Sequence, residues 1–278
     1  IEMYSDYGMP EVKPAARGNF APQMESNIKG AYGWNQAIKA DVEANKLFAN
    51  NEVKADELRK MGFGTVLTSQ KDGIVRGSGA LVFLNTQKKE NENILRDKAA
   101  GFYSFNKGTS QQDYPSSLMG SIALLRQTYL DARWYQFQTK GMEYNISLEA
   151  FLGLQVMPSI IEVSNKLNAL RADRLGDEFK VKYIIKGSGD EYQRIHDLEL
   201  ANCKFIIPLN FPDPYDVEDP FDAELVSTGE LKHWEMAPAN AKFMQDNFIP
   251  FAITTADLKD KSKFWKNCRM FSRKHHGL

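Results

Sequence analysis

Apolar residues recur at helical spacing along one long stretch of the chain. In residues 116–135, Leu118, Ile122, Leu125 and Tyr129 lie three or four positions apart, which predicts an amphipathic helix with a single apolar face. Serine at the start of this stretch can accept a hydrogen bond from an N–H group of the first turn. Similar composition and spacing predict further helices over residues 53–60, 148–153, 165–179, 190–202, 239–246 and 262–274. In the helix over 165–179 we expect Leu167, Leu170 and Leu175 to face inward.

Short runs rich in β-branched residues, bounded by glycine or proline, predict strands between these helices. The chain begins with a short predicted strand, which a Gly- and Pro-rich loop follows up to residue 32. The other predicted strands cover residues 62–69, 77–86, 155–164, 180–187, 203–212 and 248–255. Alternating strands and helices with short links are typical of an α/β protein with parallel strands and right-handed crossovers. The alternation alone leaves a closed (β/α)₈ barrel and an open doubly wound sheet as alternatives.

Both architectures place a ligand at the carboxyl ends of the strands. Functional residues are therefore expected at the following strand ends: residues 5–6, 69–70, 162–164, 186–189, 209–210 and 254–257.

Composition indicates an ordinary globular protein. The 278 residues are 42% hydrophobic, 12% aromatic and 26% charged, as expected for one large domain or two small ones. Because 35 Lys and Arg balance 36 Asp and Glu, we expect no broad field that would attract nucleic acid. The apolar runs are far shorter than the ~20 residues that span a bilayer, so we expect a soluble chain without a membrane span.

Common catalytic signatures are missing from the sequence: it contains no P-loop, no G-x-S-x-G, no H-E-x-x-H and no EF-hand loop. Two Gly-Ser-Gly turns, residues 77–79 and 187–189, can bind an anion through backbone N–H groups or can simply form the turn. Of the four histidines, His196, His233, His275 and His276, only His233 lies near a strand end. Cys203 and Cys268 are too few for a disulfide framework and lack zinc-site spacing.

Two charged stretches each leave two interpretations open. The acidic stretch 213–224 could hold a cation, but a solvated acidic loop is the favoured interpretation. The basic stretch 259–274 could contact nucleic acid, but a terminal amphipathic helix that buries its aromatic side chains is favoured.

Four segments, taken in order, resemble the amidohydrolase superfamily, in the imidazolonepropionase-related branch of large multidomain bacterial proteins. They are residues 55–84 (ADELRKMGFGTVLTSQKDGIVRGSGALVFL), 114–135, 183–212 and 247–267. The resemblance implies that residues 1–278 form a single TIM-barrel-like (β/α)₈ domain of the metal-dependent hydrolase type, truncated from a longer chain. The family's flanking β-sandwich would lie outside it, the other domains of that chain would be its partners, and its location would be periplasmic or exported.

The resemblance also shows that the family's metal ligands are replaced. The positions of the two strand-one histidines, the strand-five and strand-six histidines and the strand-eight aspartate fall on Tyr4, Asp6, Glu162, Gly187 and Ala256, with Asp257 one residue after the last. A metal that lowers the pKa of bound water toward ~7 needs ligands that hold it. We therefore expect no metal and no other cofactor.

The groups left at the strand ends are the candidate site. Asp6, Glu162 and Asp257 are the candidate catalytic residues, and Tyr4, Lys186, Ser188 and His233 are the candidate binding residues. Glu162 and Lys186 lie on adjacent predicted strands, ~4.8 Å apart, so they could pair and occupy the space of the lost metal. Strand alternation could instead turn Lys186 away.

Three functions are compatible with these residues, and the first is favoured. The first is an amidohydrolase-like domain that has lost its metal ligands and acts as a pseudoenzyme, or as a scaffold or binding domain with a small molecule or peptide at the barrel mouth. The second is an active hydrolase of C–N bonds, mostly cyclic amides, whose carboxylates serve as acid and base or hold Mg²⁺, Ca²⁺ or Mn²⁺. The third is a sugar- or peptide-binding module that uses aromatic residues, namely Tyr4, Tyr7, Phe211, Tyr215 and Trp234.

Overall fold

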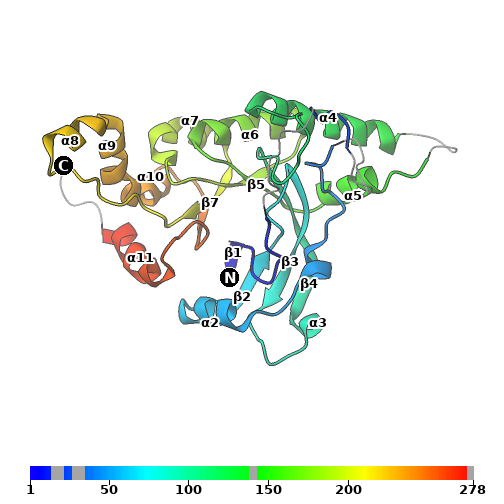
Figure 1. Ribbon diagram of the computed structural model, residues 1–278, viewed down its shortest axis with the longest axis horizontal. Coiled ribbons are helices and arrows are strands. Elements are labelled where there is room, and N and C mark those ends of the chain that lie inside the picture. The colour runs from blue at the N-terminus through cyan, green and yellow to red at the C-terminus, as the bar shows by residue number, and fades with distance from the viewer. Residues whose placement is uncertain (14–21, 27–34, 138–142, 274–278) are drawn as a thin grey trace. The chain divides into compact units, whose positions relative to one another are not determined.

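The computed structural model describes residues 1–13, 22–26, 35–137 and 143–273 (Figure 1). Eight strands follow one another in chain order across one sheet. They are β1 (Glu2–Ser5), β2 (Thr65–Thr68), β3 (Val75–Phe83), β4 (Ile94–Ser104), β5 (Ser159–Glu162), β6 (Tyr183–Lys186), β7 (Lys204–Pro208) and β8 (Phe251–Thr254). Sequential strand order is what a (β/α)₈ barrel requires.

Helices occupy the connections, and every helix expected from the sequence is present. They are α1 (Ala44–Leu47), α2 (Glu52–Lys60), α3 (Glu90–Asn93), α4 (Leu118–Gln136), α5 (Ile146–Gln155), α6 (Lys166–Phe179), α7 (Ile195–Ala201), α8 (Pro220–Leu225), α9 (Thr228–Met236), α10 (Asn240–Asp246) and α11 (Phe264–Arg273). Four of them, α1, α3, α8 and α9, were not expected, and α8 corrects the interpretation of residues 213–224 as loop throughout. Ser227 and Glu230 form a capping box at the start of α9, a sequence signal that could have revealed it.

Antiparallel pairing around β3 departs from the expected parallel pattern. β3 runs antiparallel to both β2 and β4, whereas β1–β2, β4–β5 and β7–β8 are parallel. A parallel crossover needs a dozen or more residues, and the links 69–74 and 84–93 are shorter than that. Figure 1 shows the resulting long β3–β4 hairpin, with α3 at its end.

Gly77 of β3 allows the backbone of Val42 to approach the strand closely. Its φ is +80°, and a Cβ at this position would overlap the carbonyl oxygen of Val42. We therefore expect Gly77→Ala to lower the free energy of unfolding by about 1–3 kcal/mol, measured by urea denaturation. Gly153 on α5 is the matched control, because a Cβ there meets no atom within 4 Å and Gly153→Ala should stabilise by about 0.5–1 kcal/mol. Equal effects at the two positions would contradict this account of Gly77.

The chain divides into two compact units. The first comprises Ile1–Glu162 with Ala172–Ile184, and the second comprises Val163–Arg171 with Ile185–Leu278. The expectation of a single domain over residues 1–278 stays a prediction.

An aromatic cluster fills the core of the first unit. Tyr129 stacks on Phe179 with ring centroids 4.6 Å apart, and its hydroxyl lies 2.6 Å from that of Tyr183. Burial raises the pKa values of both tyrosines far above the usual value, so their hydroxyls stay protonated and serve packing. Leu175 is buried as expected, but Leu167 is 43% exposed. The prediction for Leu167 was wrong because the buried face of α6 is formed by Ala169, Ala172 and Leu175.

Packing of helices against β7 and β8 forms the core of the second unit. Phe205 and Ile207 on β7, Met244 on α10 and Phe264 on α11 are all buried. The Asn267 side chain on α11 donates to the carbonyl oxygen of Leu209 at 2.8 Å. This bond ties the terminal helix to the end of β7. Of the aromatic residues that this helix was expected to bury, Phe264 is buried but Trp265 is 52% exposed.

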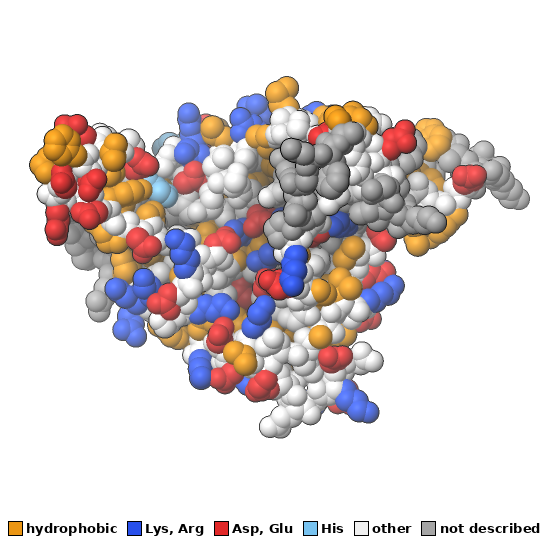
Figure 2. Space-filling view, in the orientation of Figure 1, with side chains coloured by type: hydrophobic (Ala, Val, Ile, Leu, Met, Phe, Trp, Pro, Cys, Tyr) orange, Lys and Arg blue, Asp and Glu red, His pale blue; other side chains and the backbone are white. Residues whose placement is uncertain are grey.

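Surface charge is mixed. On the face shown in Figure 2, acidic and basic side chains alternate over most of the surface, in keeping with the net charge of −1. Among the described residues, no helix combines the length and the apolar character needed to cross a bilayer.

Candidate functional site

A buried guanidinium lies at the strand ends of the first unit. Arg76 on β3 is only 5% exposed. Its Nη1 donates to the hydroxyl of Tyr4 at 2.6 Å and lies 2.8 Å from Oε2 of Glu162, while its Nε donates to the carbonyl oxygen of Gly73. The structure thus joins two predicted site residues, Tyr4 and Glu162, through a third that the sequence analysis did not single out. We call Tyr4, Arg76 and Glu162 the arginine cluster.

The ends of three strands position the arginine cluster. Tyr4 lies near the end of β1 and packs on Phe102 of β4 with ring centroids 5.8 Å apart. Glu162 is the last residue of β5, opposite Ser104 of β4. Arg76 follows the buried Val75 near the start of β3. Because β3 is antiparallel to β4, its first residues lie at the same end as the last residues of β4 and β5.

Electrostatics fix the charge of this cluster. Burial opposes the positive charge of Arg76, but Tyr4 and Glu162 more than offset that cost and raise the pKa of the guanidinium above its usual value. Arginine does not lose its proton in proteins. A permanent cation therefore lies against the carboxylate of Glu162 at the end of β5.

This donor set does not fit a divalent metal. At ~4 Å and an effective dielectric constant of about 20, two unit charges interact by ~4 kcal/mol, so a dication beside Arg76 would meet a repulsion of about 8 kcal/mol. Asp6, the other candidate of the first unit, is exposed, and its carbonyl oxygen accepts from the N–H of Met9. Metal ligation by Glu162 would require Arg76 to move away.

In the second unit, a lysine and an aspartate form a second charge pair at the strand ends. Lys186, the last residue of β6, is 3% exposed and forms an ion pair with Asp257, which follows β8. Asp257 adopts a φ of +65°, and the N–H of Ala256 donates to the side chain of Thr254 at 3.0 Å. The predicted Glu162–Lys186 pair would join the two units and stays a prediction.

The Gly-Ser-Gly turn after β6 does bind an anion, and the anion comes from the chain itself. The Glu191 carboxylate, almost fully buried, accepts the N–H groups of Ser188 at 2.8 Å and Gly189 at 3.1 Å. Asn240 donates to its Oε2 at 2.6 Å, and the Asn240 oxygen accepts from the N–H of Tyr192 at 2.8 Å. Burial raises the pKa of Glu191, although these donors act in the opposite direction.

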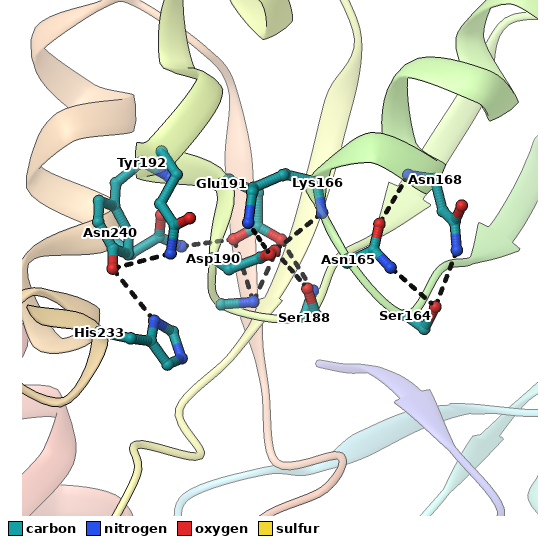
Figure 3. Close-up of polar contacts among 12 residues, drawn as sticks. Ser164, Asn165, Lys166, Asn168, Ser188, Asp190, Glu191, Tyr192, His233 and Asn240 are labelled. Carbon is teal, nitrogen blue, oxygen red and sulfur yellow. Dashed lines mark hydrogen bonds and ion pairs between the residues drawn. The ribbon is translucent and has the colours of Figure 1, made fainter. Parts of the chain in front are cut away.

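This network occupies the turn that the sequence offered as an anion site (Figure 3). A Cβ at Gly187 would overlap the carboxylate of Glu191, which explains the glycine at this position. The backbone N–H of Ser188, a candidate binding group, is committed to Glu191. Its Oγ donates to Asp190 at 2.6 Å, and Asp190 also pairs with Lys166 at 3.2 Å.

His233 on α9 pairs with a tyrosine of the same network. Its Nδ1 lies 3.1 Å from the hydroxyl of Tyr192, and Gln193 donates to that hydroxyl at 3.1 Å. The tautomer of His233 decides which of these two atoms donates, because the hydroxyl can accept from Gln193 in either case. Burial lowers the pKa of His233, Asp190 opposes this effect and Lys166 adds to it, so the imidazole is neutral at pH 7.

Metal-binding groups do not gather elsewhere in the described part of the chain. Among residues 1–13, 22–26, 35–137 and 143–273, no three His, Cys, Asp or Glu side chains are grouped so that they could hold an ion. His275 and His276 lie outside the described residues. The expectation that the chain binds no metal stays a prediction.

Comparison with known proteins bears on the fold. Neither the protein-family models nor the curated proteins gave a match. The structure is similar to the crystal structure of an amidohydrolase from Thermotoga maritima MSB8, with a TM-score of 0.68 and 16% sequence identity. The match covers 99% of this chain and 70% of that chain. The chain has an amidohydrolase-like fold.

The amidohydrolase-like fold confirms the predicted class, a TIM-barrel-like α/β domain. In such a barrel the carboxyl ends of the strands carry the site. Glu162 and Lys186 end β5 and β6, and Asp257 follows β8, so these predicted residues stand at strand ends. The imidazolonepropionase-related branch stays a prediction.

Proposed function

We propose that this chain is an amidohydrolase-like domain in which fixed contacts between cations and carboxylates replace metal ligation, and that it acts as a pseudoenzyme with a scaffold or binding role in a larger protein. The arginine cluster carries the proposal. The guanidinium of Arg76 lies 2.8 Å from the carboxylate of Glu162. Glu162 is at the strand-five ligand position, where a metal would have to bind this carboxylate.

Ion pairing also weighs against an active hydrolase built on carboxylates. A general base must lie within hydrogen-bond reach of the proton that it accepts from the substrate, and an ion pair instead holds the carboxylate against a cation of the chain. Glu162 pairs with Arg76, and Asp257 pairs with Lys186. Of the three candidates, Asp6 has no ion pair among the described residues, and a single exposed carboxylate lacks a partner group for acid–base chemistry.

Burial weighs against the aromatic binding module at the strand ends. Tyr4 and Tyr7 are each 1% exposed, so neither ring can stack on a sugar or peptide. Phe211 and Trp234 line a groove in the second unit, which belongs to a separate surface described below.

Elemental analysis tests the proposal. The full chain, purified without chelator, should contain far less than one equivalent of zinc, manganese or iron, and Glu162→Ala should leave that content unchanged. One equivalent of metal in the natural chain, lost in Glu162→Ala, would overturn the proposal and favour the active hydrolase. Asp97→Asn, at an exposed position away from the strand ends, is the matched control.

A further inference from the structure

The second unit carries an apolar groove of about 940 Å³. The segment after β7 contributes Phe211 and Pro212, α9 contributes Leu231 and Trp234, and α11 contributes Met270. Leu231, Trp234 and Met270 are 40%, 41% and 38% exposed. The groove is therefore lined by large apolar side chains that remain partly in contact with solvent.

Further exposed apolar side chains lie on α8. Phe221 and Leu225 are 79% and 82% exposed, and neither α8 nor α9 buries any of its residues. Single exposed apolar residues are common on protein surfaces, whereas neighbouring ones mark interaction sites. Four exposed large apolar residues within Phe221–Trp234 form such a group.

Acidic side chains lie along one side of this apolar surface. Residues 213–230 contain seven Asp and Glu and no Lys or Arg, and all seven acidic residues are exposed. Lys232 of α9 also lines the groove, so the acidic character belongs to the side formed by α8 and the segment before it. Figure 2 shows acidic and hydrophobic side chains next to one another over α8 and α9. Charge at the edge of an apolar groove selects a partner of opposite charge and speeds its association.

We propose that this surface, the α8–α9 groove, binds a basic amphipathic helix of a partner protein. The apolar face of such a helix would bury Trp234 and Leu231, a recurring mode of helix-in-groove recognition. Its Lys and Arg side chains would face the acidic residues of 213–224. The groove uses no residue of the arginine cluster, so the inference stands apart from the proposed function.

A second copy of the chain is a poorer occupant. The basic amphipathic helix that this chain offers is α11, and it already packs in its own unit through Phe264, which is 4% exposed, and Asn267, which is 8% exposed. Met270 of α11 also forms part of the groove. If α11 left its own unit to bind another copy, the groove of its own copy would lose the wall that α11 forms.

Binding of a designed peptide tests the inference. The probe is a fluorescein-labelled amphipathic helix of Leu and Lys, about 18 residues or five turns long, titrated with the full chain and followed by anisotropy. We expect saturable binding that weakens as salt is raised. A peptide of the same composition in scrambled order, and one with Glu in place of Lys, should each bind at least tenfold more weakly.

Variants of the chain locate the site. Trp234→Ala should weaken binding about tenfold or more, as expected for a central aromatic residue. Trp134→Ala, at a 55% exposed position on α4, is the matched control and should leave binding unchanged. Neutralising Asp216, Asp222 and Glu224 together should weaken binding about threefold and reduce its salt dependence. The control neutralises the exposed residues Glu92, Asp97 and Glu143.

Three results would overturn the inference. The first is a lack of saturable binding of the amphipathic peptide, and the second is an equal loss of binding in the Trp134 and Trp234 variants. The third is concentration-dependent dimerisation, seen by sedimentation, that Trp234→Ala abolishes, because a second copy would then occupy the groove. None of these results depends on the metal content of the chain.

Discussion

Arg76→Met should lower the free energy of unfolding by about 3 kcal/mol or more, because breaking a buried charge pair by removing one partner is strongly destabilising. Met has a similar length and keeps the apolar stem in the core. The Glu162 carboxylate, 24% exposed, and the hydroxyl of Tyr4 would both lose the guanidinium. Urea denaturation followed by circular dichroism measures the change.

The same change at a surface pair provides the control. Arg126 lies 2.9 Å from Glu178, with both side chains more than 40% exposed, and Arg126→Met should cost only about 0.2–1 kcal/mol. Adding Glu162→Gln to Arg76→Met should recover part of the loss and give a coupling of about 1–3 kcal/mol. If Arg76→Met costs no more than Arg126→Met, the arginine cluster does not hold the strand ends together.

Glu191→Gln should lower the free energy of unfolding by about 1–3 kcal/mol, the cost of leaving a buried hydrogen-bonding group unsatisfied. Its Oε1 accepts from the N–H of Ser188, and its Oε2 accepts from the N–H of Gly189 and from the side chain of Asn240. An amide has only one oxygen, so its NH₂ group would face the NH₂ group of Asn240. The variant keeps the size of the side chain and changes only its hydrogen-bonding capacity.

Exchanging the two polar groups should restore the bonds. Asn240→Asp alone places two carboxylates in contact and should also destabilise the chain, whereas the Glu191→Gln/Asn240→Asp double variant again pairs a donor with an acceptor. Asp at position 240 can still accept from the N–H of Tyr192. If the double variant is as unstable as the sum of the single ones, this hydrogen-bond assignment is wrong.

The pH dependence of Glu191 follows from the direction of its pKa shift. Burial raises its pKa above the ordinary value of 4.5, so the native state binds this proton more tightly than the unfolded chain does. The contribution of Glu191 to stability is therefore greatest below pH 4.5 and falls as the pH rises through the native pKa. The difference in stability between the natural chain and Glu191→Gln should decrease over that interval, and a constant difference would contradict the shift.

Regular periodicity made much of the fold predictable from the sequence. The helices α4 and α6 and the strands β5 to β8 follow from apolar spacing and from short turns, which are local features. β4 was missed because its first half, Ile94–Lys98, is largely charged and exposed. The antiparallel course of β3 depends on link lengths that the parallel pattern of later strands obscured.

The sequence predicted where the candidate site lies in the fold, but not which side chains contact one another there. The pattern of predicted strands placed Glu162 and Asp257 at strand ends, where the structure has them. Arg76 lies 72 residues from Tyr4, and its contact depends on the register of β3 against β4, which no local pattern specifies. Glu191 reaches the Gly-Ser-Gly turn only through the backbone geometry of that turn. An arginine that follows two buried apolar residues was the one available signal for the arginine cluster.

A crystal structure of the full chain grown with excess zinc, with anomalous diffraction recorded at the zinc edge, tests the central claim most directly. The account predicts that the guanidinium of Arg76 stays between the hydroxyl of Tyr4 and the carboxylate of Glu162, with no anomalous peak at that carboxylate. A peak about 2.0–2.2 Å from a Glu162 oxygen, the distance of a zinc ligand, with Arg76 displaced, would contradict it.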